Sequence, residues 1–217
     1  KGVYSEINSL LAGSDDAELK EKYADVSGQL PIIKELADIL YKNKKNRGCP
    51  ELETSESKLI INDEDICVGV ERRTRGRSEE IIEDFMLVAN ECAARFGMDN
   101  NLPFVYRIHE EPSDEKLESL REALVKLNVQ YKLGEKACPG DMSEILKAAK
   151  GTDIDLIMNN IVLRSMSKAR YSTEPVGHFG LALEDYAHFT SPIRRYPDLT
   201  IHRIMSAFLS GSSASPK

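Results

Sequence analysis

Two adjacent arginines near the C-terminal end of the chain are the residues best suited, by type and by spacing, to bind a negatively charged group. Arg194 and Arg195 follow Ser191-Pro192 within the segment YAHFTSPIRRYPDL, residues 186–199. A serine N-cap followed by proline favours a helix start, so both arginines are expected in the first turns of a helix. Backbone N–H groups and guanidinium donors at one helix start can bind an anion such as phosphate.

An ordinary surface role would also explain these arginines if they are considered alone. One of them would then pair with Asp198 or Glu184 in solvent. The nearby aromatic side chains would belong to the core, namely Phe179, Phe189 and Tyr196. The density of aromatics, histidines and arginines across residues 177–199 weakens this alternative, which stays open at this point.

The distribution of charge permits a polyanionic ligand although the whole chain is acidic. The net charge is -7, which argues against phosphate binding because lysine and arginine dominate such binding. Residues 160–205, in contrast, carry a net charge of +2. The charge around a groove matters more than the total, so nucleic acid stays a candidate ligand.

The spacing of apolar residues predicts a helix-rich mixed α/β (α+β) domain. Helical periodicity marks residues 30–41, 78–96, 113–127, 143–149 and 154–170. Three of these helices begin at or near a suitable N-cap, which is Ser78, Ser113 or Ser143. Extended segments are expected at residues 58–61, 66–70, 104–108 and 179–183. We therefore expect helices to outnumber strands and to cover a mixed sheet.

The cysteines and histidines give no sign of a structural zinc site. The four cysteines include no C-x-x-C pair, and the four histidines show no H-x-x-x-H spacing. We expect the cysteines to be buried reduced thiols rather than disulfides.

The chain shows no sequence signal for a membrane. No apolar run reaches the ~18 residues that a membrane span needs, and the first residues lack the layout of a signal peptide. These features predict a soluble, cytoplasmic protein.

Several segments in a fixed order resemble one known domain. GHFGLAL (residues 177–183) and YAHFTSPIRRYPDLTIHR (residues 186–203) resemble the signature near the C-terminal end of the RNB catalytic domain of RNase II/RNase R-type exoribonucleases. Further matching segments are GVYS (residues 2–5), EDFMLVAN (83–90), YRIHEEP (106–112) and LRSM (163–166). The resemblance implies processive hydrolysis of single-stranded RNA from its 3′ end, with release of 5′-nucleoside monophosphates.

The resemblance also implies roles for individual residues. Arg194 matches the family arginine that contacts the scissile phosphate, where it would stabilise charge in the transition state. Tyr4 matches a tyrosine beside the 3′-terminal nucleotides, where a ring can stack on a base. Glu83 matches a glutamate that approaches the terminal ribose and would favour RNA over DNA. Their alternatives are an ion pair for Arg194, simple packing for Tyr4 and an exposed helical charge for Glu83.

Three further residues of the signature are assigned to RNA handling or to support. Arg195 is expected to support the structure or to contact another phosphate. His178 and His188 are expected to be structural or to contact RNA, because a metal-activated water needs no imidazole base.

Family enzymes hold divalent metal with clustered aspartates, and this chain lacks a convincing equivalent. Asp15-Asp16-Ala17 ends like that motif, but Leu10, Leu11, Ala12 and Gly13 stand where further carboxylates are required. We interpret the triplet as a solvated helix start. No metal ligand is therefore expected here, whereas Mg²⁺ is expected for a full-length enzyme.

The sequence as a whole predicts a C-terminal portion of an RNB domain at residues 1–209 and a flexible tail at residues 210–217. The leading hypothesis is an exoribonuclease fragment that is inactive alone. The alternatives are a non-catalytic RNB-like RNA-binding protein and, more remotely, an unrelated interaction domain. The oligomeric state stays open.

Overall fold

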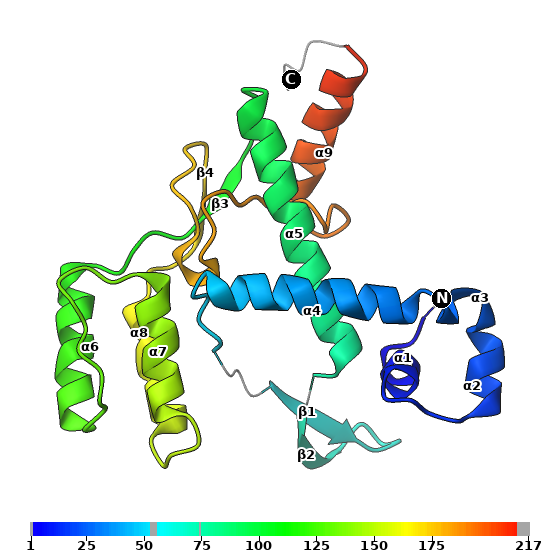
Figure 1. Ribbon diagram of the computed structural model, residues 1–217, viewed down its shortest axis with the longest axis horizontal. Coiled ribbons are helices and arrows are strands. Elements are labelled where there is room, and N and C mark those ends of the chain that lie inside the picture. Colours follow the sequence, from blue (N-terminus) through cyan, green and yellow to red (C-terminus); the bar gives the residue numbers. More distant parts are fainter. Residues whose placement is uncertain (1, 53–55, 74, 212–217) are drawn as a thin grey trace. The chain divides into compact units, whose positions relative to one another are not determined.

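The computed structural model describes residues 2–52, 56–73 and 75–211 (Figure 1). The chain divides into two compact units. Unit 1 comprises Lys1–Tyr41 and Glu53–Phe85, and unit 2 comprises Lys42–Leu52 and Met86–Lys217. Two helices contribute to both units, namely α4 (Leu30–Asn46) and α5 (Arg77–Asp99).

Unit 1 contains short helices before the first part of α4. These are α1 (Tyr4–Leu11), α2 (Ala17–Lys22) and α3 (Ala24–Ser27). The Asp16 carboxylate caps α2 by accepting hydrogen bonds from the backbone N–H groups of Glu18 and Leu19, at 3.0 and 3.2 Å. Asp15 pairs with Lys20 at the surface. The interpretation of this acidic triplet as a helix start is confirmed.

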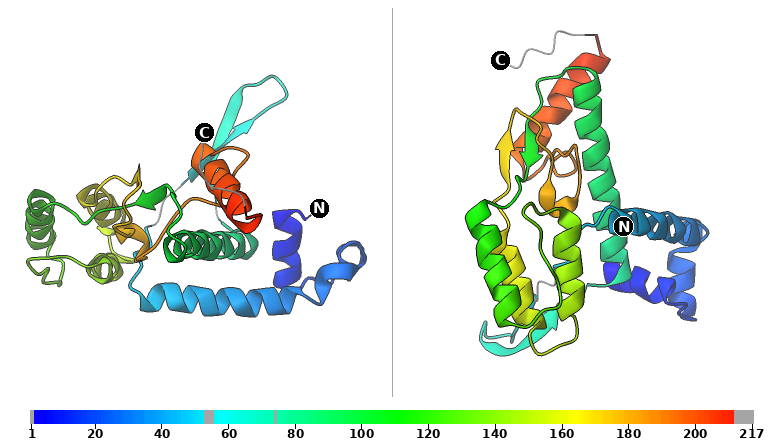
Figure 2. Two further views of the ribbon diagram at one scale, coloured as in Figure 1. Left: turned by 90° about the horizontal axis from the view of Figure 1, so that it is seen from above. Right: turned by 60° about the vertical axis from the view of Figure 1, so that its left-hand side comes forward.

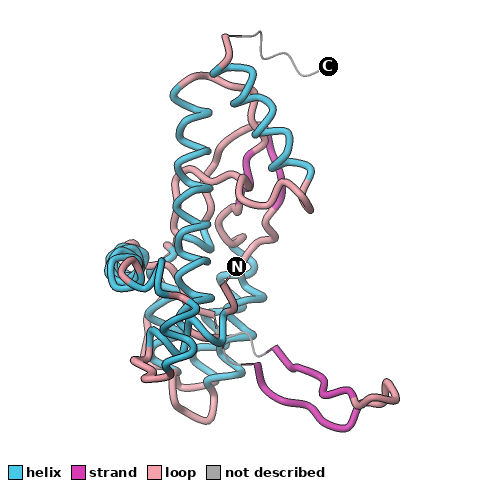
Figure 3. Tube along the Cα trace, turned by 90° about the vertical axis from the view of Figure 1, so that its right-hand side faces the viewer, coloured by secondary structure: helices cyan, strands magenta, loops and turns pink. Residues whose placement is uncertain are grey.

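A long antiparallel hairpin is the other main element of unit 1. Strand β1 (Glu56–Ile61) pairs with β2 (Cys67–Arg73), and Leu59 lies opposite Val70. A bulge between Ile60 and Ile61 shifts the register towards the turn. Figure 3 shows this hairpin as the longer of the paired magenta segments.

A three-helix module forms one core of unit 2. Helices α6 (Asp114–Lys126), α7 (Pro139–Ala149) and α8 (Asp155–Ser165) lie side by side in Figures 1 and 2. Apolar residues at helical spacing bury one face of each helix, as expected for amphipathic segments. The fully or nearly fully buried side chains are Leu117, Leu120, Leu124, Met142, Ile145, Leu146, Met158 and Val162.

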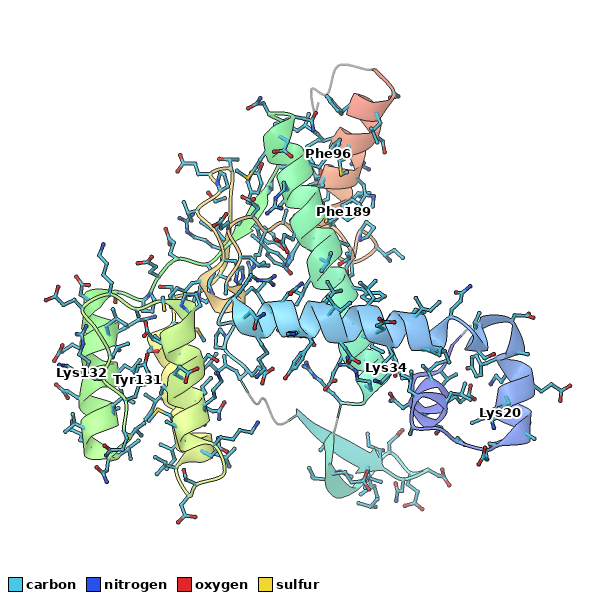
Figure 4. The ribbon with its side chains drawn as sticks, in the orientation of Figure 1. Lys20, Lys34, Phe96, Tyr131, Lys132 and Phe189 are labelled. Carbon is cyan, nitrogen blue, oxygen red and sulfur yellow. The ribbon has the colours of Figure 1, made fainter. Side chains whose placement is uncertain are left out.

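A second core of unit 2 lies between the C-terminal half of α5, α9 (Tyr196–Leu209) and a short strand pair. Strands β3 (Tyr106–Ile108) and β4 (Arg170–Ser172) are antiparallel. The core contains Ala94, Phe104, Tyr106, Ile108, Ala187, Ile201 and Ile204. Phe96 of α5 meets Phe208 of α9 edge to face, with ring centroids 5.8 Å apart. Figure 4 labels Phe96 and Phe189 in this region.

The structure confirms the helix-rich mixed class. The strands form two separate antiparallel pairs in the described part of the chain, and the parallel component is a single bridge between His109 and His178. The predicted strand at residues 179–183 is wrong, because Phe179–Leu181 form a 3-10 turn (η1). Ala182 then adopts a left-handed conformation with φ of 51°, which ends any extended segment.

Several predicted helix boundaries are also wrong. Helix α7 begins at Pro139 after the N-cap Cys138, so Ser143 lies inside it. Helix α8 ends at Ser165, because the chain continues into β4 rather than to residue 170 as a helix. Ser113 occupies the N-cap position of α6 without capping it by its side chain.

The environment of the cysteines differs from the expectation in part. All four are free thiols, but only Cys49 is buried, while Cys67, Cys92 and Cys138 are exposed. The start of the predicted tail follows α9, and residues 212–217 lie outside the described residues. In the described part of the chain, no helix combines the length and the apolar character that crossing a membrane requires.

Candidate nucleic-acid interface

The GHFGLAL segment is a tight loop held against the end of β3 by His109. The Phe179 N–H donates to the His109 carbonyl at 2.8 Å, and the Gly180 N–H donates to His109 Nδ1 at 2.9 Å. His109 Nε2 lies 2.7 Å from the Ser167 carbonyl, so it carries the proton. A Cβ at Gly180 would lie 2.7 Å from His109 Nδ1, and glycine is therefore required there.

The segment after this loop is held by Asn90 of α5. Asn90 is 2% exposed. Its Nδ2 donates to the Tyr186 hydroxyl at 3.0 Å, and its Oδ1 accepts from the backbone N–H groups of Phe189 and Thr190 at 2.9 and 3.1 Å. The Phe189 ring stacks on His202 of α9, with centroids 4.1 Å apart. One amide side chain thus fixes residues 186–190 against α5.

The next turn, residues 191–195, is held by the buried carboxylate of Asp198. Its Oδ1 accepts from the Ser191 N–H at 2.7 Å and from Arg195 Nη2 and Nε at 2.6 and 3.1 Å. Asp198 is 0% exposed, and its Oδ2 is buried without a hydrogen-bond partner among the described residues. The two ends of the turn therefore meet at one carboxylate oxygen.

The same turn presents Arg194 to solvent. Arg194 is exposed, and within the described ranges its side chain makes no hydrogen bond or ion pair. Helix α9 begins only at Tyr196, with Arg195 as its N-cap residue. The expectation that both arginines occupy first helical turns is wrong. The hydrogen bonds of Asp198 to the Ser191 N–H and to the Arg195 guanidinium, called the Asp198 clamp below, keep residues 192–194 as a separate turn. The alternative in which one arginine forms an ion pair with Asp198 describes Arg195 and not Arg194.

His188 lies among cationic side chains and is itself neutral. Its Nδ1 is 2.8 Å from the Tyr171 hydroxyl. Burial lowers the pKa of His188 to about 4, and the nearby charges of Arg195, Arg107 and Arg194 act in the same direction. At neutral pH His188 contributes an N–H donor and not a positive charge.

His178 is more deeply placed than His188. Burial lowers its pKa to about 3, and its Nδ1 has no hydrogen-bond partner in the described part of the chain. Its ring lies edge to face between His109 and Tyr186, with centroid separations of 5.0 and 5.2 Å. This position supports the structural half of the expectation for His178.

Tyr4 and Glu83 belong to unit 1. Tyr4 is the first residue of α1, is 49% exposed and accepts a hydrogen bond from Ser78 Oγ at its carbonyl. Glu83 lies on an exposed part of α5 and pairs with Arg75 at 2.9 Å. The Tyr4 ring is thus accessible, whereas the Glu83 carboxylate already has a cationic partner.

The described residues do not form a site for a metal ion. No group of three or more histidine, cysteine, aspartate or glutamate side chains comes together in residues 2–52, 56–73 and 75–211. Asp15 and Asp16, which resemble the end of the family's metal motif, are committed to Lys20 and to the α2 N-terminus. The described residues therefore do not fit Mg²⁺.

Three residues support the site in ways that the sequence does not predict. Asn90, His109 and Asp198 lie inside the segments that resemble the family. The order of residues offers Asp198 as a partner of either arginine but indicates no partner for Asn90 or His109. The hydrogen-bond partners of Asn90 lie between 96 and 100 positions further along the chain. A buried polar residue on the apolar face of a predicted helix is the available signal for Asn90, because such residues are normally hydrogen-bonded.

Replacing Asn90 with alanine should lower the free energy of unfolding by about 2–4 kcal/mol, because two backbone N–H groups and a buried hydroxyl lose their partner. Urea denaturation followed by circular dichroism would measure this change. Asn160→Ala is a matched control, since exposed Asn160 bonds only to the Leu156 carbonyl of its own helix. A loss of stability no larger than that of the control would contradict the proposed role of Asn90 in fixing residues 186–190 against α5.

The fold and this signature define a known domain class, and the chain belongs to the RNB domain family. The family model matches residues 1–211. This match agrees with the resemblance seen in the sequence.

Curated proteins that are 35–42% identical to this chain are named Ribonuclease R. The chain is 41% identical over 207 residues to Ribonuclease R 1 of Lactococcus lactis, covering 94% of this chain and 25% of that protein. It is 39% identical over 207 residues to Ribonuclease R of Escherichia coli, covering 95% of this chain and 25% of that protein. The chain therefore spans about a quarter of the length of these curated relatives.

A solved structure shares the fold. Mycoplasma genitalium RNase R in complex with ribose methylated single-stranded RNA superposes with a TM-score of 0.85 at 30% identity, covering 95% of this chain and 32% of that chain. This chain therefore shares its fold with about a third of that RNase R chain.

Proposed function

We propose that this chain is the RNA-handling, C-terminal portion of the catalytic domain of a processive 3′-to-5′ exoribonuclease that releases 5′-nucleoside monophosphates. The observation that carries the proposal is the 191–195 turn, in which Asp198 clamps Arg195 and leaves Arg194 exposed. A guanidinium that is held in place by its backbone and free at its tip suits a phosphate contact. The Ribonuclease R relatives support this assignment.

Arg194 would act on the scissile phosphate. Its planar donors can bind two phosphate oxygens at once, and preorganised donors stabilise the charge that develops in the transition state. Arg195 would act only through the turn, because its guanidinium is engaged by Asp198 and is largely shielded. The neutral imidazole of His188 would donate a hydrogen bond to RNA, and His178 would hold the loop of residues 177–183 in place.

Tyr4 and Glu83 would act at the 3′-terminal nucleotides. The exposed Tyr4 ring would stack on a base without reading its identity. Glu83 would accept from a ribose 2′-hydroxyl and so favour RNA, in exchange with its contact to Arg75. Residues 1–209 would then constitute this portion of the domain and residues 210–217 a tail, in a cytoplasmic protein.

The isolated chain should bind single-stranded RNA without degrading it. Binding should fall as salt rises, because phosphate contacts release counterions, and Arg194→Ala should reduce the slope of log K against log salt by about one. With Mg²⁺ or Mn²⁺ no nucleoside monophosphate should appear, because hydrolysis of this type needs clustered carboxylates. Fluorescence anisotropy and chromatography of the products would measure these two properties.

One control variant and two contrary outcomes make the measurements decisive. Arg121→Ala removes a half-buried arginine that contacts Glu118 and the Gly134 carbonyl in the three-helix module, and it should leave the slope unchanged. Release of monophosphates by the pure chain would refute the proposal that this portion of the domain binds RNA without hydrolysing it. Binding by both the isolated chain and a full-length protein that never cleaves would favour the non-catalytic RNB-like alternative.

A further inference from the structure

The outer face of the β3–β4 pair carries an arginine and a tyrosine in direct contact. Arg107 and Tyr171 are cross-strand partners, so their side chains leave the same face. The Arg107 guanidinium carbon lies 5.0 Å from the centre of the Tyr171 ring. The neighbours of Arg107 in β3, Tyr106 and Ile108, are buried on the opposite face. This short sheet therefore has one core face and one accessible face.

The Tyr171 ring is accessible and held in place. It is 39% exposed, and its hydroxyl is hydrogen-bonded to His188 Nδ1. The His188 ring lies edge to face with both Tyr171 and the buried Tyr186, at centroid separations of 5.6 and 5.8 Å. Tyr186 is in turn fixed by Asn90. The exposed ring is thus connected to α5 through two further rings.

The surroundings of this face are positively charged. Arg107, Arg194 and Arg195 are each close enough to His188 to oppose its protonation, and Asp198 is the carboxylate that acts against them. Asp198 is already engaged by Arg195. In the described ranges the Arg107 side chain makes no hydrogen bond or ion pair, and its contact is the Tyr171 ring. A guanidinium that touches an exposed ring and keeps its N–H donors available suits a nucleotide, which offers a flat base and a phosphate.

We propose that Tyr171, Arg107 and His188 form a binding site for one nucleotide of single-stranded RNA, separate from the contact of Arg194 with the scissile phosphate. The base lies against the Tyr171 ring, Arg107 meets a phosphate and His188 holds the ring in position. The site deepens the proposed function and rests on it. Stacking of this kind tolerates any base, because every base has a π face.

Abasic scanning would test this site. A short single-stranded oligoadenylate is prepared with one base removed at each position in turn, and its affinity for the 217-residue chain is measured. The parent chain should lose roughly 5- to 150-fold in affinity at the position whose base contacts the Tyr171 ring, the effect of one lost stacking contact, in addition to any loss at the position that Tyr4 contacts. In Tyr171→Leu this position-specific penalty should disappear, whereas Tyr171→Phe should retain it, because the ring stays. Arg107→Gln should reduce the salt slope by about one.

The outcomes separate this site from the function on which it rests. If Tyr171→Leu shows the same abasic penalties as the parent at every position, the nucleotide site is overturned while RNA binding stands. If the leucine variant fails to fold, Tyr171→Ile, which also lacks a ring and suits a strand, is measured in its place, and an unchanged abasic penalty there would overturn the nucleotide site. If the parent chain binds no RNA, both the site and the proposed function are wrong.

Discussion

Arg194→Ala in the full-length enzyme proposed above should reduce the rate of RNA cleavage by ~10²–10³, equivalent to roughly 3–4 kcal/mol of transition-state stabilisation. The reason is that charge developing on the scissile phosphate is local, and Arg194 is the exposed arginine that the 191–195 turn presents. Binding should change little, because many contacts share the strand. Single-turnover cleavage and equilibrium binding at one stated salt concentration measure the two effects.

The variants Arg194→Lys and Arg195→Lys test whether catalysis needs the guanidinium geometry of Arg194 or only a positive charge in the turn. Arg194→Lys restores the positive charge but not the two-pronged geometry, so most of the defect should remain. Arg195→Lys would disturb the clamp on Asp198 and should reduce stability in addition to rate. Full activity of Arg194→Lys would show that charge alone is needed and would remove the argument from geometry.

Asp198→Ala should lower the free energy of unfolding by about 3–5 kcal/mol, the usual cost of removing one partner from a buried ion pair. The carboxylate is 0% exposed, and its loss leaves the Ser191 N–H and the Arg195 guanidinium without their acceptor. Removing the buried Oδ2, which has no hydrogen-bond partner among the described residues, would by itself stabilise the fold. The variant is nevertheless expected to be less stable, because the loss of three hydrogen bonds at Oδ1 dominates. Urea denaturation of the chain measures the change.

A double-mutant cycle would separate the ion pair from general damage to the core. Asp198→Ala combined with Arg195→Ala should cost less than the sum of the single changes, because the double variant leaves no buried charge unpaired. Asp198→Asn should be intermediate, since it keeps one neutral acceptor. Strict additivity of the two alanine variants would contradict the clamp and, with it, the explanation for the exposed position of Arg194.

The parts of the fold that sequence could predict are those with long periodic patterns. Helices α5 and α6 are expected close to their observed bounds, and α4 at its observed start, because each repeats apolar residues over several turns. The observed α4 continues five residues beyond the predicted end at residue 41, to Asn46. The segment Phe179–Leu181 is misassigned because alternating apolar residues also occur in a loop that is fixed by distant contacts to His109. Short helices such as α1 to α3 carry too few residues for a periodic signal.

The sequence names Arg194 and Arg195 as candidate phosphate contacts but does not provide their arrangement. The Ser191-Pro192 pair suggests a helix start, whereas the helix begins later, at Tyr196, because Asp198 binds back to Ser191 and Arg195. Sequence spacing leaves the pairing of Asp198 with either arginine open, and the structure assigns it to Arg195. The stacking of Arg107 on Tyr171 depends on strand register between segments far apart in the chain, which a single sequence does not provide.

The most direct test of the proposed ribonuclease role is a single-turnover experiment on the full-length enzyme with RNA labelled along its length. Parent and Arg194→Ala proteins are each saturated with RNA, and the release of 5′-nucleoside monophosphates is followed over time. We predict that the variant releases the same monophosphates ~10²–10³ more slowly while its dissociation constant for RNA stays within a few-fold of the parent value. Cleavage by saturated Arg194→Ala at the parent rate would contradict the proposal, and an ion-pair or packing role would then replace catalysis for this residue.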